Sequence, residues 1–393
     1  MKYHPLLPFV AACSLLTSCF KEEPLNAECD IEAVYFHLDE PLGTFYQLGD
    51  TLQKVLSDNT DVVFNVRREP AADLSLVEPQ LVLTPGASVK SSVKAVDQAT
   101  GTVRWEYVVG SQDKQWSRAY TVSVVPTSRT VRDTVAYDFE NFELEPQKKK
   151  YYVWHDELND GQWGNNWATG NAGYQMSMNK APADQYPSVP LADGYDGNGV
   201  KLTTLSTGPF GVVSNMRIAA GNFFLGKFDV SSALTDAMKA TCMGIPFDRK
   251  PLKLQGYYKY TPGEVFQDRN GKPVENRTDA ADIYAVFYRN EETVTTSDGK
   301  TETRPVMLHG EDTKTNPNIV AIAQVAYVKP TTEWTLFDVT FDYMSEVNLE
   351  TLVSRGYNLA LVFSSSIDGH HFQGAIGSQL CIDKVRVVCE KEE

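Results

Sequence analysis

The stretch LKLQGYYKYTP, residues 252–262, alternates between two kinds of side chain. Successive side chains of a β-strand point to opposite faces of a sheet, so the alternation predicts a strand with one face in a core and the other toward water or a cleft. The core set is Leu252, Leu254, Gly256 and Tyr258, and the outward set is Lys253, Gln255, Tyr257 and Lys259.

The same kind of pattern recurs from about residue 135 to residue 393. Further strand candidates are GNGVKLTTLS, DIYAVFYRN, IVAIAQVAYV, TLFDVTFDYM, YNLALVFSSS and SQLCIDKVRVV. We expect one short helix over 229–240, with Leu234 and Met238 on one face, and one or two helical turns within 346–356. Seven or more strands with so little helix predict a jelly-roll or related β-sandwich over 135–393.

The preceding region, residues 31–128, consists of short β-branched and aromatic runs separated by Gly, Pro, Asp and Asn. Short strands at regular spacing predict a small immunoglobulin-like sandwich. The polar segment 126–134 is predicted to be a linker with little strand. The fold class expected for the whole chain is therefore all-β, with a small sandwich followed by a larger jelly-roll sandwich.

Residues 1–19 resemble a lipoprotein signal peptide. Lys2 precedes the apolar run LLPFVAACSLL, which is too short to span a bilayer, and the run closes on LTSC, which resembles a bacterial lipobox. The resemblance implies lipidation of Cys19. The following FKEE resembles the signal that sends lipoproteins of some Gram-negative gut bacteria to the outside of the outer membrane. We therefore expect a lipid-anchored, surface-exposed protein that does not span the membrane.

Charge and cysteine content exclude several classes of protein. A net charge of -15 argues against nucleic acid as a partner, because nucleic acids require clustered Lys and Arg. Beyond the signal region the chain has four cysteines with no C-x-x-C spacing, which is no disulfide framework and no zinc motif. The sequence leaves open whether two of them form a single disulfide bond. These four are Cys29, Cys242, Cys381 and Cys389.

An ordered set of motifs in the second region resembles a known family. The motifs are YDFENF (137–142), WATGNAGY (167–174), IAAGNFFLGKF (218–228), LQGYYKYTPG (254–263) and LVFSSSIDG (361–369), followed by GAIGSQLCIDKVRVV (374–388). From about Val135 to Cys389 the chain resembles the putative carbohydrate metabolism domain family of surface lipoproteins from gut bacteria. The resemblance implies a jelly roll akin to carbohydrate-binding modules and jelly-roll glycoside hydrolases, preceded by an immunoglobulin-like domain, and it points to glycans.

The segment WHDELNDGQWGNNWATGNAGY, residues 154–174, is the first candidate for a sugar site. Sandwiches that bind sugars lay aromatic rings against the apolar face of the pyranose and bind its hydroxyls with polar side chains. The segment supplies both kinds, although its tryptophans would alternatively cap the core while its asparagines form turns. The candidates are Trp154, Trp163, Asn165, Asn166, Trp167 and Asn171.

A second candidate surface comes from the later strands. Tyr257 belongs to the outward set of its strand, and Tyr284 and Tyr288 share one face of DIYAVFYRN, where they line a concave sheet or fill a buried face. His371 follows a strand in a turn and is expected at a rim. Trp334, in EWTLFDVTF, is expected in the core.

Metal binding and catalysis receive weaker support. Glu140 and Asp383, near the first and last strands of the second region, are candidate ligands of a structural calcium ion, and Asp383 would alternatively cap a turn. The interiors of the strand candidates carry no pair of carboxylates spaced for glycoside hydrolysis, so no catalytic residue is assigned. The loop acids Asp156, Glu157, Asp160 and Glu264 stay open as an alternative.

The predicted function is therefore non-catalytic binding of an oligo- or polysaccharide by a cell-surface lipoprotein. The alternatives are a glycoside hydrolase or lyase that uses the loop acids, and a structural component of the cell surface.

Overall fold

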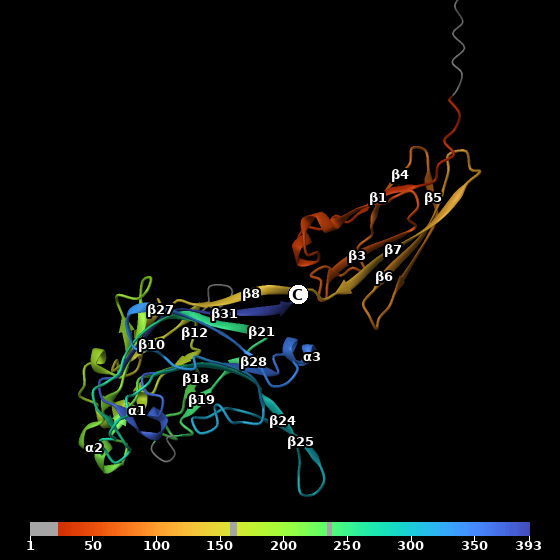
Figure 1. The fold of residues 1–393 in the computed structure, drawn as a ribbon. Helices are drawn as coiled ribbons and strands as arrows, with labels where there is room; N and C mark the ends of the chain where they lie inside the picture. The colour runs from red at the N-terminus through yellow and green to blue at the C-terminus, as the bar shows by residue number, and fades with distance from the viewer. Residues whose placement is uncertain (1–22, 158–162, 234–237) are drawn as a thin grey trace, which may run out of the picture. The chain divides into compact units, whose positions relative to one another are not determined.

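The computed structural model describes residues 23–157, 163–233 and 238–393, and it is an all-β protein (Figure 1). Strands make up 46% and helices 9% of the described residues, which confirms the predicted fold class. The chain divides into two compact units. The first unit ends at Arg129 and also includes the residue Glu393, and the second unit covers Thr130–Glu392. The predicted signal peptide and Cys19 lie outside the described residues.

The first unit is a sandwich of two small sheets. Its core is formed by Phe64, Trp105 and Val122 with their neighbours, all buried. One sheet has the order β2-β1-β4, with β1 Ile31–Tyr35, β2 Leu52–Lys54 and β4 Gln80–Leu83. The other has the order β3-β7-β6-β5, with β3 Asp61–Arg67, β5 Ser88–Val96, β6 Val103–Gly110 and β7 Ser117–Thr127, and only its β3–β7 pair is parallel among the described pairs. Two short 3-10 turns span Pro41–Gly43 and Leu48–Thr51.

The second unit is a larger sandwich of two antiparallel sheets. The β21 sheet has the order β14-β15-β31-β21-β27, and β8 also pairs with β31. Its strands are β8 Thr130–Tyr137, β14 Ser188–Leu191, β15 Gly199–Thr203, β21 Lys250–Thr261, β27 Thr331–Thr340 and β31 Gln379–Glu392. The β23 sheet has the order β13-β18-β29-β23-β26-β28, with β19 beside β18 and β20 beside β29. Its strands are β13 Trp167–Ala168, β18 Asn222–Phe228, β19 Thr241–Met243, β20 Ile245–Pro246, β23 Asp282–Arg289, β26 Ile319–Gln324, β28 Asp342–Tyr343 and β29 Tyr357–Ser364.

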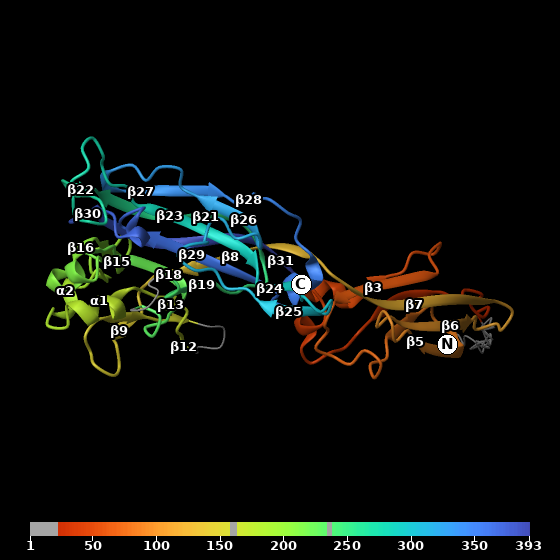
Figure 2. The ribbon, with the colours of Figure 1, turned by 90° about the horizontal axis from the view of Figure 1, so that it is seen from below.

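Short helices and hairpins complete the second unit. Helices α1 and α2 lie at one end of it in both views (Figures 1 and 2). The helices are α1 Asn171–Ser177, α2 Gly208–Val213 and α3 Leu349–Val353, with 3-10 turns η3 Ala183–Gln185 and η4 Gly369–His371. The hairpins are β9 Phe142–Leu144 with β10 Tyr152–Trp154, β11 Asp156–Glu157 with β12 Trp163–Gly164, and β24 Glu291–Thr295 with β25 Thr301–Pro305. Two further pairs are β16 Leu205–Ser206 with β17 Ile218–Ala219, and β22 Phe266–Gln267 with β30 Gly374–Ala375.

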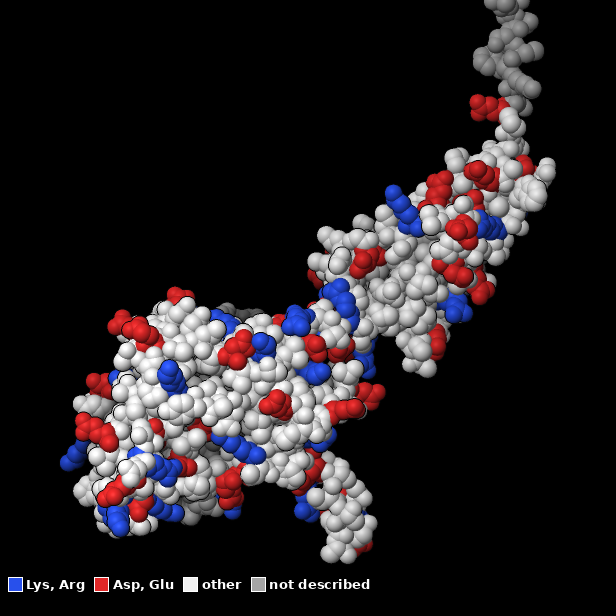
Figure 3. All heavy atoms as spheres, in the orientation of Figure 1, with Lys and Arg blue, Asp and Glu red and all other residues white. Residues whose placement is uncertain are grey.

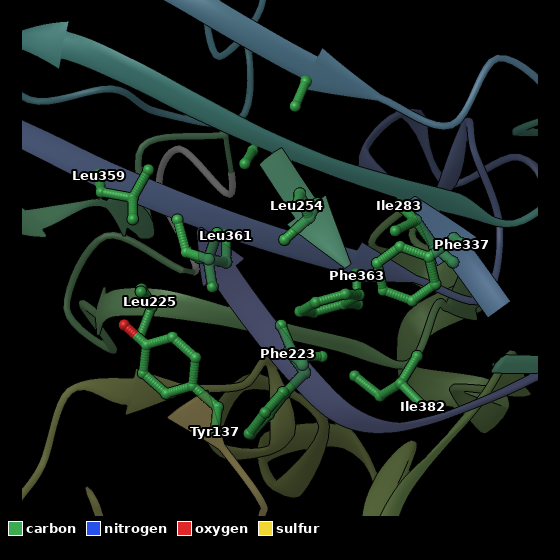
Figure 4. Packing of buried hydrophobic residues seen from close by; sticks show 14 of the residues in the cluster. Tyr137, Phe223, Leu225, Leu254, Ile283, Phe337, Leu359, Leu361, Phe363 and Ile382 are labelled. Atoms are coloured by element: carbon green, nitrogen blue, oxygen red, sulfur yellow. The ribbon is translucent and has the colours of Figure 1, made fainter. Parts of the chain in front are cut away.

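The core of the second unit lies between its two sheets (Figure 4). Leu254 and Phe337 enter it from the β21 sheet, and Ile283 and Phe363 from the β23 sheet. From Leu254 onward the alternation of β21 is as predicted, because Leu254, Gly256 and Tyr258 are buried and their odd-numbered neighbours are not fully buried. Leu252, also expected in the core, is only partly buried, next to an irregularity in the pairing of β21 with β31 between Pro251 and Lys253.

Three sequence-based expectations about local structure are wrong. Of the helix expected over 229–240, residues 230–233 and 238–240 form turns, and Leu234 lies outside the described residues. The predicted linker 126–134 is mostly strand, because β7 runs to Thr127 and β8 starts at Thr130 to pair with β31. Trp334 is half-buried and outside the core, because it shares the outward face of β27 with Leu336 and Asp338.

Three properties of the described part of the chain concern its helices, its surface charges and its cysteines. None of its helices is long and apolar enough to cross a membrane. Acidic and basic side chains are interspersed on the face that Figure 3 shows. Its four cysteines are free, so the disulfide that the sequence left open does not form.

Candidate functional site

A cavity of about 480 Å³ opens over the outer face of the β23 sheet. Its volume lies within the range of roughly 300–1,000 Å³ that is typical of small-molecule sites. Its floor includes Asn222 of β18, Tyr284 of β23 and Val362 of β29. Its walls come from α1, from α2 with the residues that follow it, from 310–315 and from 367–372.

Strand alternation decides which side chains form the floor. Ile283, Ala285 and Phe287 of β23 point into the core between the sheets, so Asp282, Tyr284, Val286 and Tyr288 point to the other face. Val286 and Tyr288 are covered by a second layer of side chains that includes Met243 and Leu308. The half of this face with Asp282 and Tyr284 is left to line the cavity.

A charged group lies at one side of the floor. The Nζ atom of Lys314 lies 2.7 Å from Oδ2 of Asp282, and Nε2 of Gln324 donates to Oδ1 of the same carboxylate at 3.2 Å. Lys314 also lies 4.2 Å above the centre of the Tyr284 ring, a cation–π contact. Burial and the adjacent Asp282 carboxylate raise the pKa of Tyr284 above its ordinary range, so its hydroxyl stays protonated and can donate.

The loop 365–372 forms one wall and is held from beneath. Asp279, 3% exposed, accepts hydrogen bonds from the hydroxyls of Ser366 at 2.5 Å and Ser378 at 2.7 Å and from the backbone N–H of Ala375 at 2.8 Å. Ser366 also shares a hydrogen bond with Thr204 at 2.6 Å. The serines of LVFSSSIDG therefore fix the loop that presents Asp368, His370 and Phe372 to the cavity.

Apolar side chains dominate the remaining lining. They come from α2, from the strands on either side of it and from the residues around β19, and they give the cavity apolar walls beside a polar end. The members are Phe210, Met216, Ile218, Phe228, Met238 and Met243. A carbohydrate presents this combination, because a pyranose has apolar faces and a rim of hydroxyls.

Two of the predicted tyrosines and the predicted histidine lie on or behind this face. Tyr284 lines the cavity under Lys314, and His371 lies next to the lining residue His370 with the two rings 3.9 Å apart. Tyr288 is fully buried: its hydroxyl donates to the carbonyl oxygen of Met243 at 2.7 Å and accepts from Asn358 at 2.9 Å. Its prediction as a sugar contact is therefore wrong.

The tryptophans of the 154–174 segment are core residues and not a sugar platform. Trp154 is 2% and Trp167 is 7% exposed. Trp167 stacks on Phe223 with the ring centres 4.2 Å apart and the planes 3° apart, and Trp154 meets Phe223 edge-on at 5.0 Å. The prediction for these two rings is wrong, and the alternative reading, that they cap the core, is the one that the structure supports. The side chain of Trp163 lies outside the described residues.

The asparagines of this segment have local partners. Asn171 is fully buried and pairs with the backbone of Ser188 through both ends of its amide, at 2.7 and 3.1 Å, so its predicted role in sugar binding is wrong. Asn165 is exposed and its Oδ1 lies 2.6 Å from Nδ1 of His155. Asn166 donates to the carboxylate of Asp156. Neither Asn165 nor Asn166 lines the cavity.

Tyr257 lies on the other side of the sandwich. It points outward from the β21 sheet, as its alternation predicts, and its ring stacks on Tyr195. The cavity and Tyr257 are therefore on separate surfaces of the second unit.

The two proposed calcium ligands both hydrogen-bond to the loop 193–199, and a lysine pairs with one of them, Glu140. Glu140 accepts from the backbone and side-chain N–H groups of Asn198 at 3.0 and 2.8 Å, and Asp383 accepts from the backbone of Asp196 at 3.0 Å. The Nζ atom of Lys384 lies 3.7 Å from Glu140 and 3.2 Å from Asp196. An ammonium group thus pairs with Glu140 and Asp196, while Asp383 accepts hydrogen bonds from the backbone. Within the described residues no group of three or more His, Cys, Asp or Glu side chains could hold a metal ion.

The carboxyl groups with a raised pKa lie away from the cavity. Burial raises the pKa of Asp156, against hydrogen bonds from Asn166 and Trp167, and burial also raises the pKa of Asp383. A raised pKa is what the acid of a glycosidase requires. The carboxylates that line the cavity are Asp282, Glu311 and Asp368, of which Asp282 pairs with Lys314 and Asp368 with Arg277.

Sequence reasoning missed Asp282, Lys314 and Asp368 as lining residues. One signal was available for Asp282, which stands at an outward position of an otherwise apolar strand. The others come from loops whose partners are distant in the sequence.

Comparison with known proteins agrees with a carbohydrate-related domain. One crystal structure, described as a putative glycoside hydrolase from Bacteroides thetaiotaomicron, is 37% identical, covers 94% of this chain and 98% of its own, and superposes with a TM-score of 0.58. A second, described as a putative glycoside hydrolase from Bacteroides vulgatus, is 36% identical over 65% of this chain and 97% of its own, with a TM-score of 0.57. A search of curated proteins gave no match. Residues 138–388 match the family model, and the chain therefore belongs to the family described as putative carbohydrate metabolism domain.

Proposed function

We propose that the cavity over the β23 sheet binds a carbohydrate without cleaving it. The observation that carries the proposal is the combination of apolar walls with one polar end, where Asp282, Lys314 and Asn222 present hydrogen-bonding groups beside the Tyr284 ring. The family is one of carbohydrate metabolism, which makes a glycan the ligand class that fits this chemistry.

The absence of cleavage is proposed from the charges at the site. Hydrolysis needs one carboxyl group that holds its proton and a second that is ionised. Asp282 forms an ion pair with Lys314 and Asp368 forms one with Arg277, so each of these carboxylates is already bound by a cation. These ion pairs suit carboxylates that accept hydrogen bonds from hydroxyls and do not suit a proton donor.

Blocking the cavity is expected to abolish carbohydrate binding while leaving the fold intact. Thr315 is exposed and lines the cavity, so Thr315→Trp places a large ring in its opening. A glycan array with the purified full chain identifies the ligand, and calorimetry then compares the variants. We expect at least a tenfold loss of affinity for Thr315→Trp, since a ring in the opening displaces ligand contacts that are worth about 1.5–3 kcal/mol for each hydrogen bond to a charged group.

Thr303→Trp is the matched control, because Thr303 is exposed on the β24–β25 hairpin and does not line the cavity. It should bind as the unaltered chain does. Equal binding by Thr315→Trp and Thr303→Trp would exclude the cavity as the site.

A glycoside hydrolase is the second candidate, because three carboxylates line the same cavity and the two similar crystal structures are described as putative glycoside hydrolases. The measurement is release of reducing ends from the array ligand. Binding without release supports the first proposal. Release that is lost in Asp282→Asn, Glu311→Gln or Asp368→Asn would replace it with hydrolysis.

We also propose that the chain is a surface lipoprotein of the outer membrane, anchored through Cys19. The lipobox LTSC and the following FKEE support this location. Cys19→Ala should abolish incorporation of labelled palmitate and release the protein from the membrane fraction. Retention of Cys19→Ala on membranes through detergent-free washing would contradict the anchor. As a control, replacing Lys21, Glu22 and Glu23 should leave the protein lipidated but protected from external protease.

A further inference from the structure

Three aromatic rings form an exposed cluster on the outer face of the β21 sheet, which we call the Tyr195 platform. It consists of Tyr195, Tyr257 and Trp334. Tyr195 stacks on Tyr257 with the ring centres 3.6 Å apart and the planes 7° apart, and its centre lies 6.3 Å from that of Trp334 at 81°. Tyr195 is 47% exposed. The Tyr195 ring is thus exposed to solvent on the side away from Tyr257, and the Trp334 ring lies nearly perpendicular to it at its edge.

The platform is held in place by hydrogen bonds of the loop 193–199. Asp383 accepts from the backbone of Tyr195 and, at 3.0 Å, from that of Asp196, while Glu140 accepts from Asn198. Gly197 has a φ of +80°, and a Cβ atom there would lie 2.1 Å from Oε1 of Glu140. Glycine is the residue that fits this position, and the hydrogen bonds to Asp383 and Glu140 hold the loop that places Tyr195 over Tyr257.

Two lysines lie beside the rings on the same face. Lys201 of β15 and Lys259 of β21 are the register partners of Cys381 on the two sides of β31. Nζ of Lys259 lies 5.0 Å from the centre of the Trp334 ring. Neither Lys201 nor Lys259 forms an ion pair within the described residues, whereas the neighbouring Lys253 pairs with Asp338 at 3.1 Å. In a chain of net charge -15 these are two ammonium groups on the same face as the rings that an anionic group of a ligand can reach.

We propose that the Tyr195 platform is a second carbohydrate-binding site, specific for acidic glycans. A pyranose ring lies on Tyr195 against the edge formed by Trp334, and a carboxylate or sulfate group of the glycan binds Lys259 and Lys201. Aromatic rings bind the apolar face of a sugar whatever its charge, so the lysines supply the preference for acidic chains. The site is independent of the cavity, because the two lie on the outer faces of different sheets with the core between them.

Affinity electrophoresis of the full chain tests the proposal with three probes: polygalacturonate, chondroitin sulfate and the neutral polymer dextran. We expect retardation by one or both acidic polymers and none by dextran at low salt. Tyr195→Ala should weaken binding about tenfold, as loss of a central aromatic contact does. Lys201→Met with Lys259→Met should remove the binding and its dependence on salt.

Control variants separate this site from the cavity and from loss of folding. Tyr327→Ala removes a tyrosine that is 63% exposed elsewhere in the second unit, and it should bind as the unaltered chain does. Thr315→Trp should also leave the acidic polymers bound, so failure of the cavity proposal does not affect this one. Circular dichroism with thermal melting checks that Tyr195→Ala is folded.

Several results would overturn the proposal. Absence of binding to both acidic polymers would do so, as would binding that is unchanged in Tyr195→Ala or in the double lysine variant. Equal retardation by dextran, insensitive to the lysines, would show that the platform does not select acidic chains. Retardation by only one of the two acidic polymers identifies the group, carboxylate or sulfate, that the lysines bind.

Discussion

Trp167→Ala is expected to lower the free energy of unfolding of the second unit by about 3 to 5 kcal/mol, the usual cost of removing a buried aromatic side chain. The ring is 7% exposed and stacks on Phe223 at 4.2 Å, and its indole N–H donates to Asp156. The substitution therefore leaves a cavity and removes a hydrogen bond from a buried carboxylate. Urea unfolding followed by tryptophan fluorescence and circular dichroism measures the loss.

Trp334→Ala is the matched control, since the half-buried Trp334 lies on the outer face of β27. It should cost about 1 kcal/mol, near the centre of the range for single substitutions. A stable Trp167→Ala protein that binds carbohydrate more weakly would contradict the assignment of Trp167 to the core and restore it as a ligand contact.

Asp279→Ala is expected to cost about 3 kcal/mol or more. Its carboxylate accepts from Ser366, Ser378 and Ala375, and each buried donor left without a partner costs about 1–3 kcal/mol. Since the same bonds fix the loop that carries Asp368 and His370, ligand affinity of the cavity should fall as well, although Asp279 does not line it. Asp279→Asn keeps one acceptor oxygen and should lose less of both.

Unfolding and calorimetric binding are measured on the same preparations. Asp298→Ala, which removes an exposed acid from the β24–β25 hairpin turn, should change neither quantity beyond about 0.5 kcal/mol. If Asp279→Ala bound ligand as the unaltered chain does, the loop would not depend on this carboxylate.

Strand alternation predicted the fold because it reports directly which side chains are buried. The same alternation also indicates the observed position of Trp334, because Leu336 and Asp338 share its face, and an aspartate four residues after Trp334 marks that face as solvent-exposed. The expectation that Trp334 is a core residue came from the identity of the residue and not from its face.

The tryptophans of the 154–174 segment show why polar neighbours do not indicate exposure. Asp156, which pairs with Gly164 in the β11–β12 hairpin, accepts the indole hydrogen bond of Trp167, and Asn166 donates to the same carboxylate. These polar residues supply the hydrogen bond that lets the ring be buried. A buried indole needs such a partner. Polar residues around a tryptophan are therefore as typical of a buried ring as of a binding surface.

The cavity could not be predicted because its residues meet only through long-range pairing. Asn222, Tyr284 and Val362 belong to three strands that are neighbours in the sheet order β18-β29-β23 and far apart in the sequence. Asp282 and Lys314, which form its charged end, lie 32 positions apart. No local pattern of residue types specifies such a set.

The position of β31 in its sheet has a consequence for how the second unit folds. This strand pairs with β21 along one side and with β15 and β8 along the other, so the last strand of the unit lies in the middle of its sheet. Val385 lies opposite Tyr137, a separation of 248 residues. The two halves of the sheet cannot join before β31 has been synthesised, and pairing over such separations is slow. The unit must therefore complete its fold after translation of the whole domain, and the edges of β15 and β21 remain open until then, which is when such a chain is most prone to aggregate.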